Sequence, residues 1–153
     1  ILELAYGSGN LKITSTDPNV QPELNYNYFQ DDPRDLERLR EAVRKCIEVL
    51  EHDDYKPIVK QMLEPQPADL VSDDTLDFWL KRNVTTTQHI SGTCKMGPDS
   101  DSMAVVDQQG NVKGLQGLRV ADASIMPDCI RANTNCTTIM IGERVADWIM
   151  QGQ

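Results

Sequence analysis

The sequence predicts an α+β fold, in which short strands and longer helices come from separate parts of the chain. Three observations favour it. Residues 1–5 and 11–14 are short β-prone segments on either side of turn residues. Residues 32–50 repeat their apolar side chains with the period of an amphipathic helix. Residues 134–150 form an apolar segment that is too long for a strand, which indicates another helix.

The first part of the chain, residues 1–84, is expected to begin with the two strands around a turn at residues 6–10 and to continue through a loop at residues 17–22. Asp32 is the expected cap of the long helix, with Pro33 at its first helical position. The buried stripe of this helix is expected to contain Leu36, Leu39, Val43, Cys46, Ile47 and Leu50.

Two further helices are expected in this part. A short one covers residues 57–63 and is ended by the prolines of Pro65-Gln66-Pro67. Ser72 caps the next helix. Its core face contains Leu76, Trp79 and Leu80. We therefore interpret Trp79 as a core residue rather than a ligand contact.

The second part, residues 85–153, opens with the β-prone residues 85–87 and a compact turn at residues 88–97. Gly92 and Gly97 allow close backbone approach in this turn. The elements expected after it are a hairpin of residues 104–106 and 111–113, a buried strand at residues 118–121 and a helix at residues 134–150. The helix is apolar round most of its circumference. We therefore expect it to pack deeply against further protein, through Ile141, Val145 and Trp148.

Composition narrows the function classes. Of 153 residues, 39% are apolar and 25% are charged, which is typical of a globular chain. The net charge of −9 argues against a nucleic-acid partner, because such proteins present a basic surface. No apolar run reaches the ~18 residues of a transmembrane segment. The chain begins at Ile1 without a signal peptide, so we expect a piece of a longer protein and favour the cytoplasm.

The cysteines and histidines do not form a metal-binding pattern. The four cysteines are Cys46, Cys94, Cys129 and Cys136. They lack C-x-x-C spacing, and His52 and His89 are the only histidines, so we expect no metal and reduced, packed thiols.

His89 and Asn133 are the candidate catalytic pair. They lie 44 residues apart, so only a tertiary fold can bring them together. A neutral imidazole and an amide that face one small polar substrate can act as a base and a hydrogen-bond donor. Local context alone also allows a structural histidine, and Asn133 is a good helix cap.

The motifs of the chain resemble the carboxyl-terminal signature of the glucose-methanol-choline (GMC) oxidoreductases, which are flavoenzymes that oxidise alcohols. They are H-x-x-G-T-x-x-M-G at residues 89–97, V-D at 106–107, G-L-R-V-A-D-A-S-x-M-P at 117–127 and N-T-N-x-x-T-I-M-I-x-E at 133–143. The first part is also similar, with G-N-L-K-I at 9–13, S-x-D-P at 15–18 and N-Y at 25–26. Within the family, the chain is most similar to the choline dehydrogenases and choline oxidases.

The resemblance implies an architecture and a cofactor. Residues 1–84 would belong to the later part of a substrate domain built on an antiparallel sheet. Residues 85–153 would carry the active-site residues and supply the last strand and helix of an α/β domain that binds FAD. The family's Gly-x-Gly-x-x-Gly turn is absent from this sequence, so an amino-terminal FAD-binding region, or a separate chain, is the expected partner.

The resemblance also implies the roles of individual residues. His89 matches the catalytic base, and Asn133 matches the second polar group over the flavin. Contacts with FAD are expected from Asp122, Ala123, Asn133, Thr134, Asn135 and Thr137. The substrate would be a small-molecule alcohol, which loses its hydroxyl proton to histidine and a hydride to the flavin.

Three interpretations of function remain open. The first is an FAD-dependent alcohol dehydrogenase or oxidase. The second is a lyase on the same scaffold, in which bound flavin takes no part in redox chemistry. The third is an inactive fragment, or a subunit that needs a separate FAD-binding chain. Asp122 also has a simpler interpretation, because it is able to cap a turn.

Overall fold

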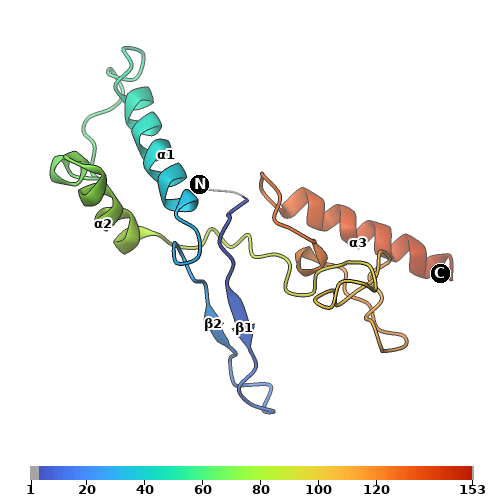
Figure 1. Ribbon diagram of the computed structural model, residues 1–153. Coiled ribbons are helices and arrows are strands. Elements are labelled where there is room, and N and C mark those ends of the chain that lie inside the picture. The colour runs from blue at the N-terminus through green and yellow to red at the C-terminus, as the bar shows by residue number, and fades with distance from the viewer. Residues whose placement is uncertain (1–3, 153) are drawn as a thin grey trace. The chain divides into compact units, whose positions relative to one another are not determined.

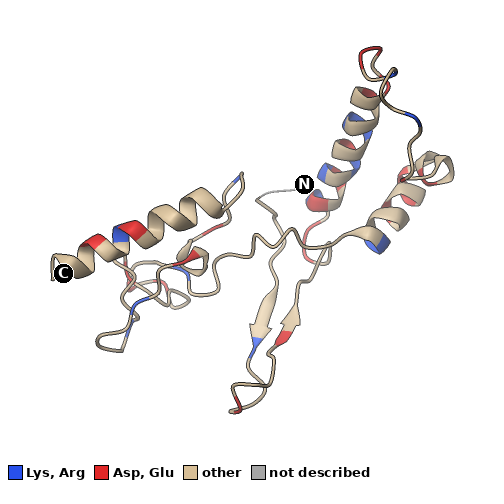
Figure 2. Ribbon diagram, turned by 180° about the vertical axis from the view of Figure 1, so that it is seen from behind, with Lys and Arg blue, Asp and Glu red and all other residues tan. Residues whose placement is uncertain are grey.

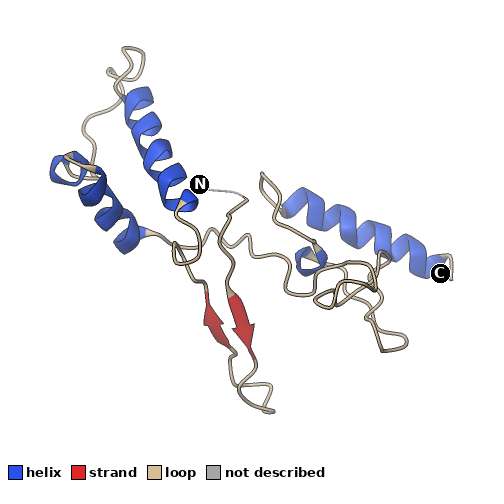
Figure 3. Cartoon of the chain, viewed as in Figure 1, coloured by secondary structure: helices blue, strands red, loops and turns tan. Residues whose placement is uncertain are grey.

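The computed structural model describes residues 4–152, which form two compact units that meet in sequence between Thr85 and Thr86 (Figure 1). These described residues contain a small antiparallel sheet and three α-helices (Figure 3). No helix among the described residues is long and apolar enough to span a membrane.

The sheet lies in the first unit and consists of β1 (Asn10–Lys12) and β2 (Glu23–Asn25). The two strands are antiparallel, with Leu11 opposite Leu24. Gly9 permits this pairing, because a Cβ at this position would lie 2.4 Å from the carbonyl oxygen of Asn25. The loop predicted at residues 17–22 connects them and is confirmed.

The predicted hairpin of residues 1–5 and 11–14 is wrong where it can be compared. Residues 1–3 lie outside the described residues, and Leu4 and Ala5 are not in a strand. The partner of β1 is instead β2, later in the chain. The physical reason is that strand pairing depends on a distant partner, whereas turn residues at 6–10 only permit a change of direction.

Helix α1 (Arg34–Leu50) is confirmed. Asp32 Oδ1 accepts a hydrogen bond from the Arg34 N–H at 2.9 Å, as expected of a capping side chain. The N-cap position itself is occupied by Pro33, so the expectation that Pro33 is the first helical residue is wrong by one position. Only the first part of the predicted stripe is covered. Leu36 is buried, whereas Cys46 and Leu50 are exposed. The expectation of burial is therefore wrong for Cys46 and Leu50, whereas Ile47 is half-buried.

Helix α2 (Asp73–Asn83) explains this difference, because its 11 residues cannot cover the 17 of α1. Leu76 and Leu80 pack with Leu36 to form the core of the unit. Ser72 accepts from the Thr75 N–H and caps α2 as predicted. Trp79 packs against this core, as expected.

Charged side chains also join α1 and α2. Figure 2 shows acidic and basic residues along both helices. The Arg40 Nε lies 2.8 Å from Asp77 Oδ1. Arg40 and Arg44 both pair with Asp73, and the hydrogen bond from Arg44 is the main cause that holds the pKa of Asp73 below its ordinary value.

The helix predicted at residues 57–63 is wrong. Turns occupy residues 51–58, and residues 59–63 have no regular structure. Pro57 disfavours helical geometry at the residue before it, and Pro65 prevents continuation downstream. The helical turn that forms in this region is the 3₁₀ helix η1 (Pro67–Leu70).

The second unit consists of the 3₁₀ helix η2 (Ala123–Ile125), helix α3 (Asn135–Met150) and long connecting segments (Figure 3). Its core consists of Val106, Ile125, Met126, Ile141 and Val145. The core therefore joins the connecting segments to η2 and to one face of α3.

The predicted hairpin around residues 108–110 forms a tight turn with one antiparallel bridge, between Val106 and Val112. Asp107 organises the turn, because its Oδ1 accepts from the N–H groups of Gln109 and Asn111 at 2.8 and 2.9 Å. Burial raises the pKa of Asp107, but the hydrogen bonds from Asn111 and Gln109 outweigh it and hold the pKa below its ordinary value.

The expected buried strand at residues 118–121 is wrong. In this segment only Arg119 forms a bridge, with Asn111, and Leu118 is 48% exposed. Residues 85–87 also form no strand. Within the described residues, segment 118–121 pairs with residues 110–112 along one edge only, which is too little pairing to bury a strand.

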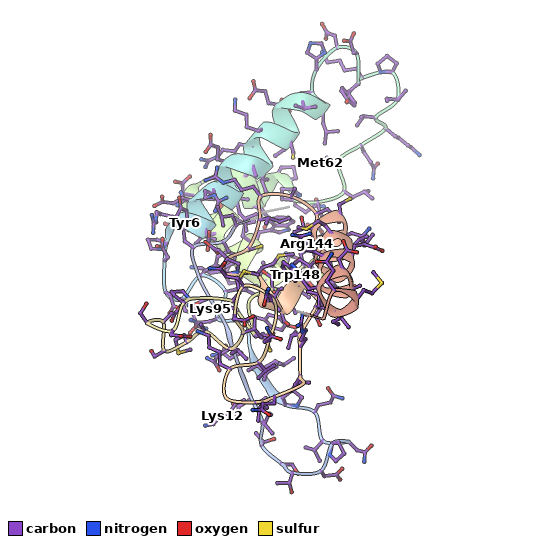
Figure 4. All side chains as sticks on the ribbon, turned by 90° about the vertical axis from the view of Figure 1, so that its right-hand side faces the viewer. Tyr6, Lys12, Met62, Lys95, Arg144 and Trp148 are labelled. Carbon is purple, nitrogen blue, oxygen red and sulfur yellow. The ribbon has the colours of Figure 1, made fainter. Side chains whose placement is uncertain are left out.

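Helix α3 is confirmed, but its burial differs from the prediction. Ile141 and Val145 are buried in the unit's own core, so they are not free to pack against further protein as predicted. Trp148 is half-buried, and the guanidinium of Arg144 lies 4.9 Å from its ring centroid (Figure 4). The exposed apolar residues of the helix are Ile139, Met140, Ile149 and Met150. The apolar surface therefore lies on a different face from the one predicted.

Candidate functional site

The segment that begins with His89 lies beside η2 and is joined to it by backbone hydrogen bonds. The N–H groups of Gly92, Cys94 and Met96 donate to the carbonyl oxygens of Ala123, Ser124 and Ile125, respectively. Gln88, directly before His89, has a φ of 63°, which is uncommon for a residue with a side chain. The direction of the chain at His89 is therefore set by neighbouring structure rather than by local preference.

Asn133 and Thr134 begin helix α3. Asn133 Oδ1 accepts a hydrogen bond from the Asn135 N–H at 2.9 Å. Asn133 therefore provides the capping contact. Thr134 occupies the N-cap position, but its hydroxyl makes no capping hydrogen bond. Thr134 is buried, with 8% of its surface exposed, whereas Asn133 is exposed.

The structure brings His89 into contact with both residues. Asn133 Nδ2 lies 3.3 Å from His89 Nε2, and Thr134 Oγ1 lies 3.0 Å from His89 Nδ1. Both ring nitrogens of the half-buried imidazole therefore have a polar neighbour at the start of α3. The two members of the predicted catalytic pair meet despite their separation of 44 residues.

The orientation of the Asn133 amide decides what His89 Nε2 can do. The amide oxygen already accepts the Asn135 N–H, so the NH₂ group points toward His89. An NH₂ group only donates, and Nε2 must therefore accept, which requires a lone pair on this nitrogen. A nitrogen with a free lone pair is a base. The site can thus accept a proton at Nε2.

The remaining predicted residues lie on η2 and the first turn of α3. Asp122 is exposed, and its Oδ1 accepts the Ser124 N–H at 2.8 Å, so it caps η2. Ala123 is half-buried and accepts the Gly92 N–H. Asn135 is exposed and Thr137 is half-buried. These residues lie in the same unit as His89. Within it, η2 and α3 pack together through Ile125 and Ile141.

Two hollows in the described structure lie elsewhere. One, of about 390 Å³, lies between residues 97–99 and 107–109. The other, of about 500 Å³, lies between the end of α1 and residues 59–64. No cluster of His, Cys, Asp and Glu side chains within residues 4–152 is arranged to hold a metal ion. The cysteines are free.

The contact between Thr134 and His89 is the feature that sequence reasoning missed. The sequence marked Thr134 as a cofactor contact, while the structure directs its hydroxyl to the imidazole. A threonine at a helix start is common, so its type alone gave no signal. The position next to Asn133 was the available indication, since two adjacent residues at a helix start can reach two atoms of one ring.

Comparison with known proteins places the chain among oxidoreductases. It belongs to the GMC oxidoreductase family, whose model matches residues 5–142. The resemblance found in the sequence motifs is thereby confirmed. The chain is 43% identical over 141 residues to the oxygen-dependent choline dehydrogenase of Yersinia pseudotuberculosis serotype IB (strain PB1/+), a match that covers 92% of this chain. It is 41% identical to the oxygen-dependent choline dehydrogenase 1 of Chromohalobacter salexigens over 91% of the chain.

Solved structures agree with this assignment. Pyridoxine 4-oxidase from Mesorbium loti matches 94% of this chain with a TM-score of 0.83 and 29% identity, over 27% of its own length. A variant of formate oxidase from Aspergillus oryzae RIB40 matches 97% with a TM-score of 0.85 and 27% identity, over 26% of its own length. The chain spans 24% of the length of the two choline dehydrogenases.

Proposed function

We propose that the complete protein to which this chain contributes is an FAD-dependent alcohol oxidoreductase, in which His89 removes the hydroxyl proton of the substrate. The observation that carries the proposal is the contact of 3.3 Å between Asn133 Nδ2 and His89 Nε2. In this contact, a basic nitrogen lies beside an N–H donor. Alcohol oxidation needs this pair, one group to take the hydroxyl proton and one to stabilise the oxygen.

His89 and Asn133 have different roles at the substrate hydroxyl group. The substrate O–H donates to His89 Nε2, and this nitrogen takes the proton. Asn133 Nδ2 carries two hydrogens, and it directs one toward Nε2 when no substrate is present. With a substrate in place, an N–H of Asn133 donates to the substrate oxygen and stabilises its developing negative charge. FAD, when bound, supplies the hydride acceptor that no side chain provides.

The start of α3 fits an electron-rich cofactor. The helix has 16 residues and no acidic residue in its first turn, so the positive end of its dipole is not neutralised there. Asn133 satisfies the N–H of Asn135, and Thr138 N–H donates to the Thr134 carbonyl oxygen, which leaves the N–H groups of Cys136 and Thr137 without an acceptor in the helix. Such helix starts favour anions and electron-rich groups. The residues that would hold FAD are Asp122, Ala123, Asn133, Thr134, Asn135 and Thr137.

The remaining part of the enzyme would supply what this chain lacks. We assign residues 1–84 to the later part of the substrate domain and residues 85–153 to the segment that completes the FAD domain. An amino-terminal region, or a separate chain, would hold the cofactor phosphates through a glycine-rich turn. The exposed apolar residues of α3, Ile139, Met140, Ile149 and Met150, are suited to contact that region.

The substrate is proposed to be a small-molecule alcohol, and choline is the first compound to assay because relatives at 41–43% identity are named choline dehydrogenases. The lyase alternative is not favoured, because the relatives and structures described above are named for oxidation. The chain alone, at 24% of the length of those relatives, is proposed to be inactive until the rest of the enzyme is added.

The test is flavin reduction in the complete protein. The FAD-loaded enzyme is mixed anaerobically with choline and with a set of other primary alcohols. The expected result is loss of the visible absorbance of oxidised flavin with at least one alcohol, together with formation of the aldehyde. A bound flavin that stays oxidised with every alcohol, while cyanohydrin cleavage proceeds, would support the lyase instead. Protein without bound FAD would contradict both.

A further inference from the structure

Thr134 has a buried hydroxyl group that makes no contact expected of a helix cap. Only 8% of its surface is exposed, and its side chain forms no capping hydrogen bond with α3. A buried hydroxyl without a partner is destabilising, so its position needs an explanation. The explanation is His89 Nδ1, at 3.0 Å from Thr134 Oγ1.

The geometry fixes which of the two groups donates. Asn133 Nδ2 faces His89 Nε2 as a donor, so Nε2 carries no hydrogen. A neutral imidazole has one N–H, which must then lie on Nδ1. Nδ1–H therefore donates to Thr134 Oγ1. In the opposite tautomer, Nε2–H would meet the Asn133 NH₂ group with two donors face to face.

We propose that Thr134 is a positioning residue that holds His89 in the tautomer with the hydrogen on Nδ1. The proposal rests on the proposed function above, because it concerns the state in which Nε2 acts as the base. Thr134 acts through His89 and needs no contact with the substrate. The hydrogen bond partner of one ring nitrogen commonly selects the state of the other, and here that partner is a hydroxyl at a helix start.

Three variants of the complete, FAD-loaded protein separate this role from a structural one. Thr134→Val keeps the shape of the side chain and removes the acceptor. Thr134→Ser restores an acceptor at the same position. Thr138→Val is the matched control, since Thr138 Oγ1 donates to the Thr134 carbonyl oxygen and does not face His89.

The first readout is the rate of flavin reduction by alcohol at saturating concentration. We expect Thr134→Val to lower it about 10–100-fold, by analogy with the loss seen when the hydrogen-bond partner of a metal-ligating histidine is removed. Thermal unfolding should change little, and each rate is expressed per bound FAD because Thr134 is also among the residues proposed to hold the cofactor. Thr134→Ser should recover most of the rate, and Thr138→Val should match the wild type.

The second readout does not depend on activity. The ¹⁵N chemical shifts of labelled histidines distinguish Nδ1–H from Nε2–H, and the His89 signals are identified by their loss in His89→Ala. We expect the Nδ1–H pattern in the wild type and in Thr134→Ser, and a mixture or the Nε2–H pattern in Thr134→Val.

Each contrary outcome has a distinct meaning. An Nε2–H pattern in the wild type overturns the proposal without any variant, even if Thr134→Val does not fold. A Thr134→Val enzyme with the wild-type rate and tautomer overturns it as well, while the base assignment survives provided that His89→Ala is slow. If His89→Ala reduces its flavin at the wild-type rate, the proposed function itself fails.

Discussion

Replacing Asn133 with aspartate separates its two contacts. The carboxylate keeps an oxygen for the Asn135 N–H, so the start of α3 remains capped. It loses the NH₂ group that faces His89 Nε2 at 3.3 Å. A negative charge at that distance attracts a proton onto Nε2 and removes the lone pair needed for catalysis.

The size of this effect follows from the distance. Two unit charges 3.3 Å apart attract by about 1 kcal/mol in water and about 5 kcal/mol at an effective dielectric constant near 20. Asn133 is exposed, so solvent screening places the effect toward the lower value. An attraction of about 1 kcal/mol raises the proton affinity of Nε2 by somewhat less than tenfold, so we expect the neutral fraction of His89 at pH 7 to fall about two- to fivefold, and flavin reduction to fall with it.

The assay is anaerobic stopped-flow reduction of the FAD-loaded complete protein between pH 6 and pH 10. Asn133→Asp should be slow at pH 7 and should regain part of its rate as the pH rises. Its thermal stability should stay close to that of the wild type, whereas Asn133→Ala should lose about 1 kcal/mol from the missing cap. A wild-type rate and pH dependence in Asn133→Asp would show that the Asn133 NH₂ group does not set the protonation of His89 Nε2.

Three further predictions concern stability and are measured by thermal unfolding. Gly110 and Gly114 have similar φ values, 79° and 80°. A Cβ at Gly110 would lie 2.6 Å from the Val120 carbonyl oxygen, whereas a Cβ at Gly114 would have no atom within 4 Å. Gly110→Ala should therefore be less stable than Gly114→Ala by about 1–3 kcal/mol. Leu76→Ala should cost about 2–5 kcal/mol, because Leu76 is 1% exposed in the core of its unit. Folding lowers the pKa of Asp107 below its ordinary value of 3.8, so the ionised carboxylate stabilises the folded state above that pH. This stabilisation is lost as the pH falls through the lowered pKa. Asp107→Asn should therefore be less stable than the wild type at pH 7, and the difference should shrink at pH 2–3. Equal stabilities of the two alanine variants, an unaffected Leu76→Ala or a constant Asp107→Asn difference would each contradict the corresponding statement.

Local signals explain why the helices could be predicted. Ser72 caps α2 and Asp32 contacts the first turn of α1, and both contacts involve residues within three positions of the cap. The apolar segment of α3 was long enough to exclude a strand. Such information lies entirely within the segment that folds.

Pairing and burial could not be predicted in the same way. The partner of β1 is β2, a later segment, and the pairing depends on a close approach at Gly9 that no local pattern reveals. The face of α3 that is buried depends on Val106 and Ile125, which reach it through tertiary packing. Residues 118–121 look buried in sequence, but in the described structure they pair along one edge only.

The candidate site was partly predictable. The motifs indicated His89 and Asn133, and the structure brings them together. The contact of Thr134 with Nδ1 was not predictable, because it depends on the angle at which the segment before α3 meets the imidazole. The roles of Asp122 and Thr137 toward FAD stay predictions.

The role of His89 as the base is tested by comparing the two histidines of the chain. His89→Ala and His52→Ala are made in the complete protein, loaded with FAD, and mixed anaerobically with an alcohol that reduces the wild-type flavin. His52 is the control because its side chain is 65% exposed and pairs only locally, with Asp54. We expect a fall of about 10²–10⁴-fold in flavin reduction for His89→Ala, unchanged FAD content, and the wild-type rate for His52→Ala. Flavin reduction at the wild-type rate in His89→Ala would contradict the role of His89 as the base.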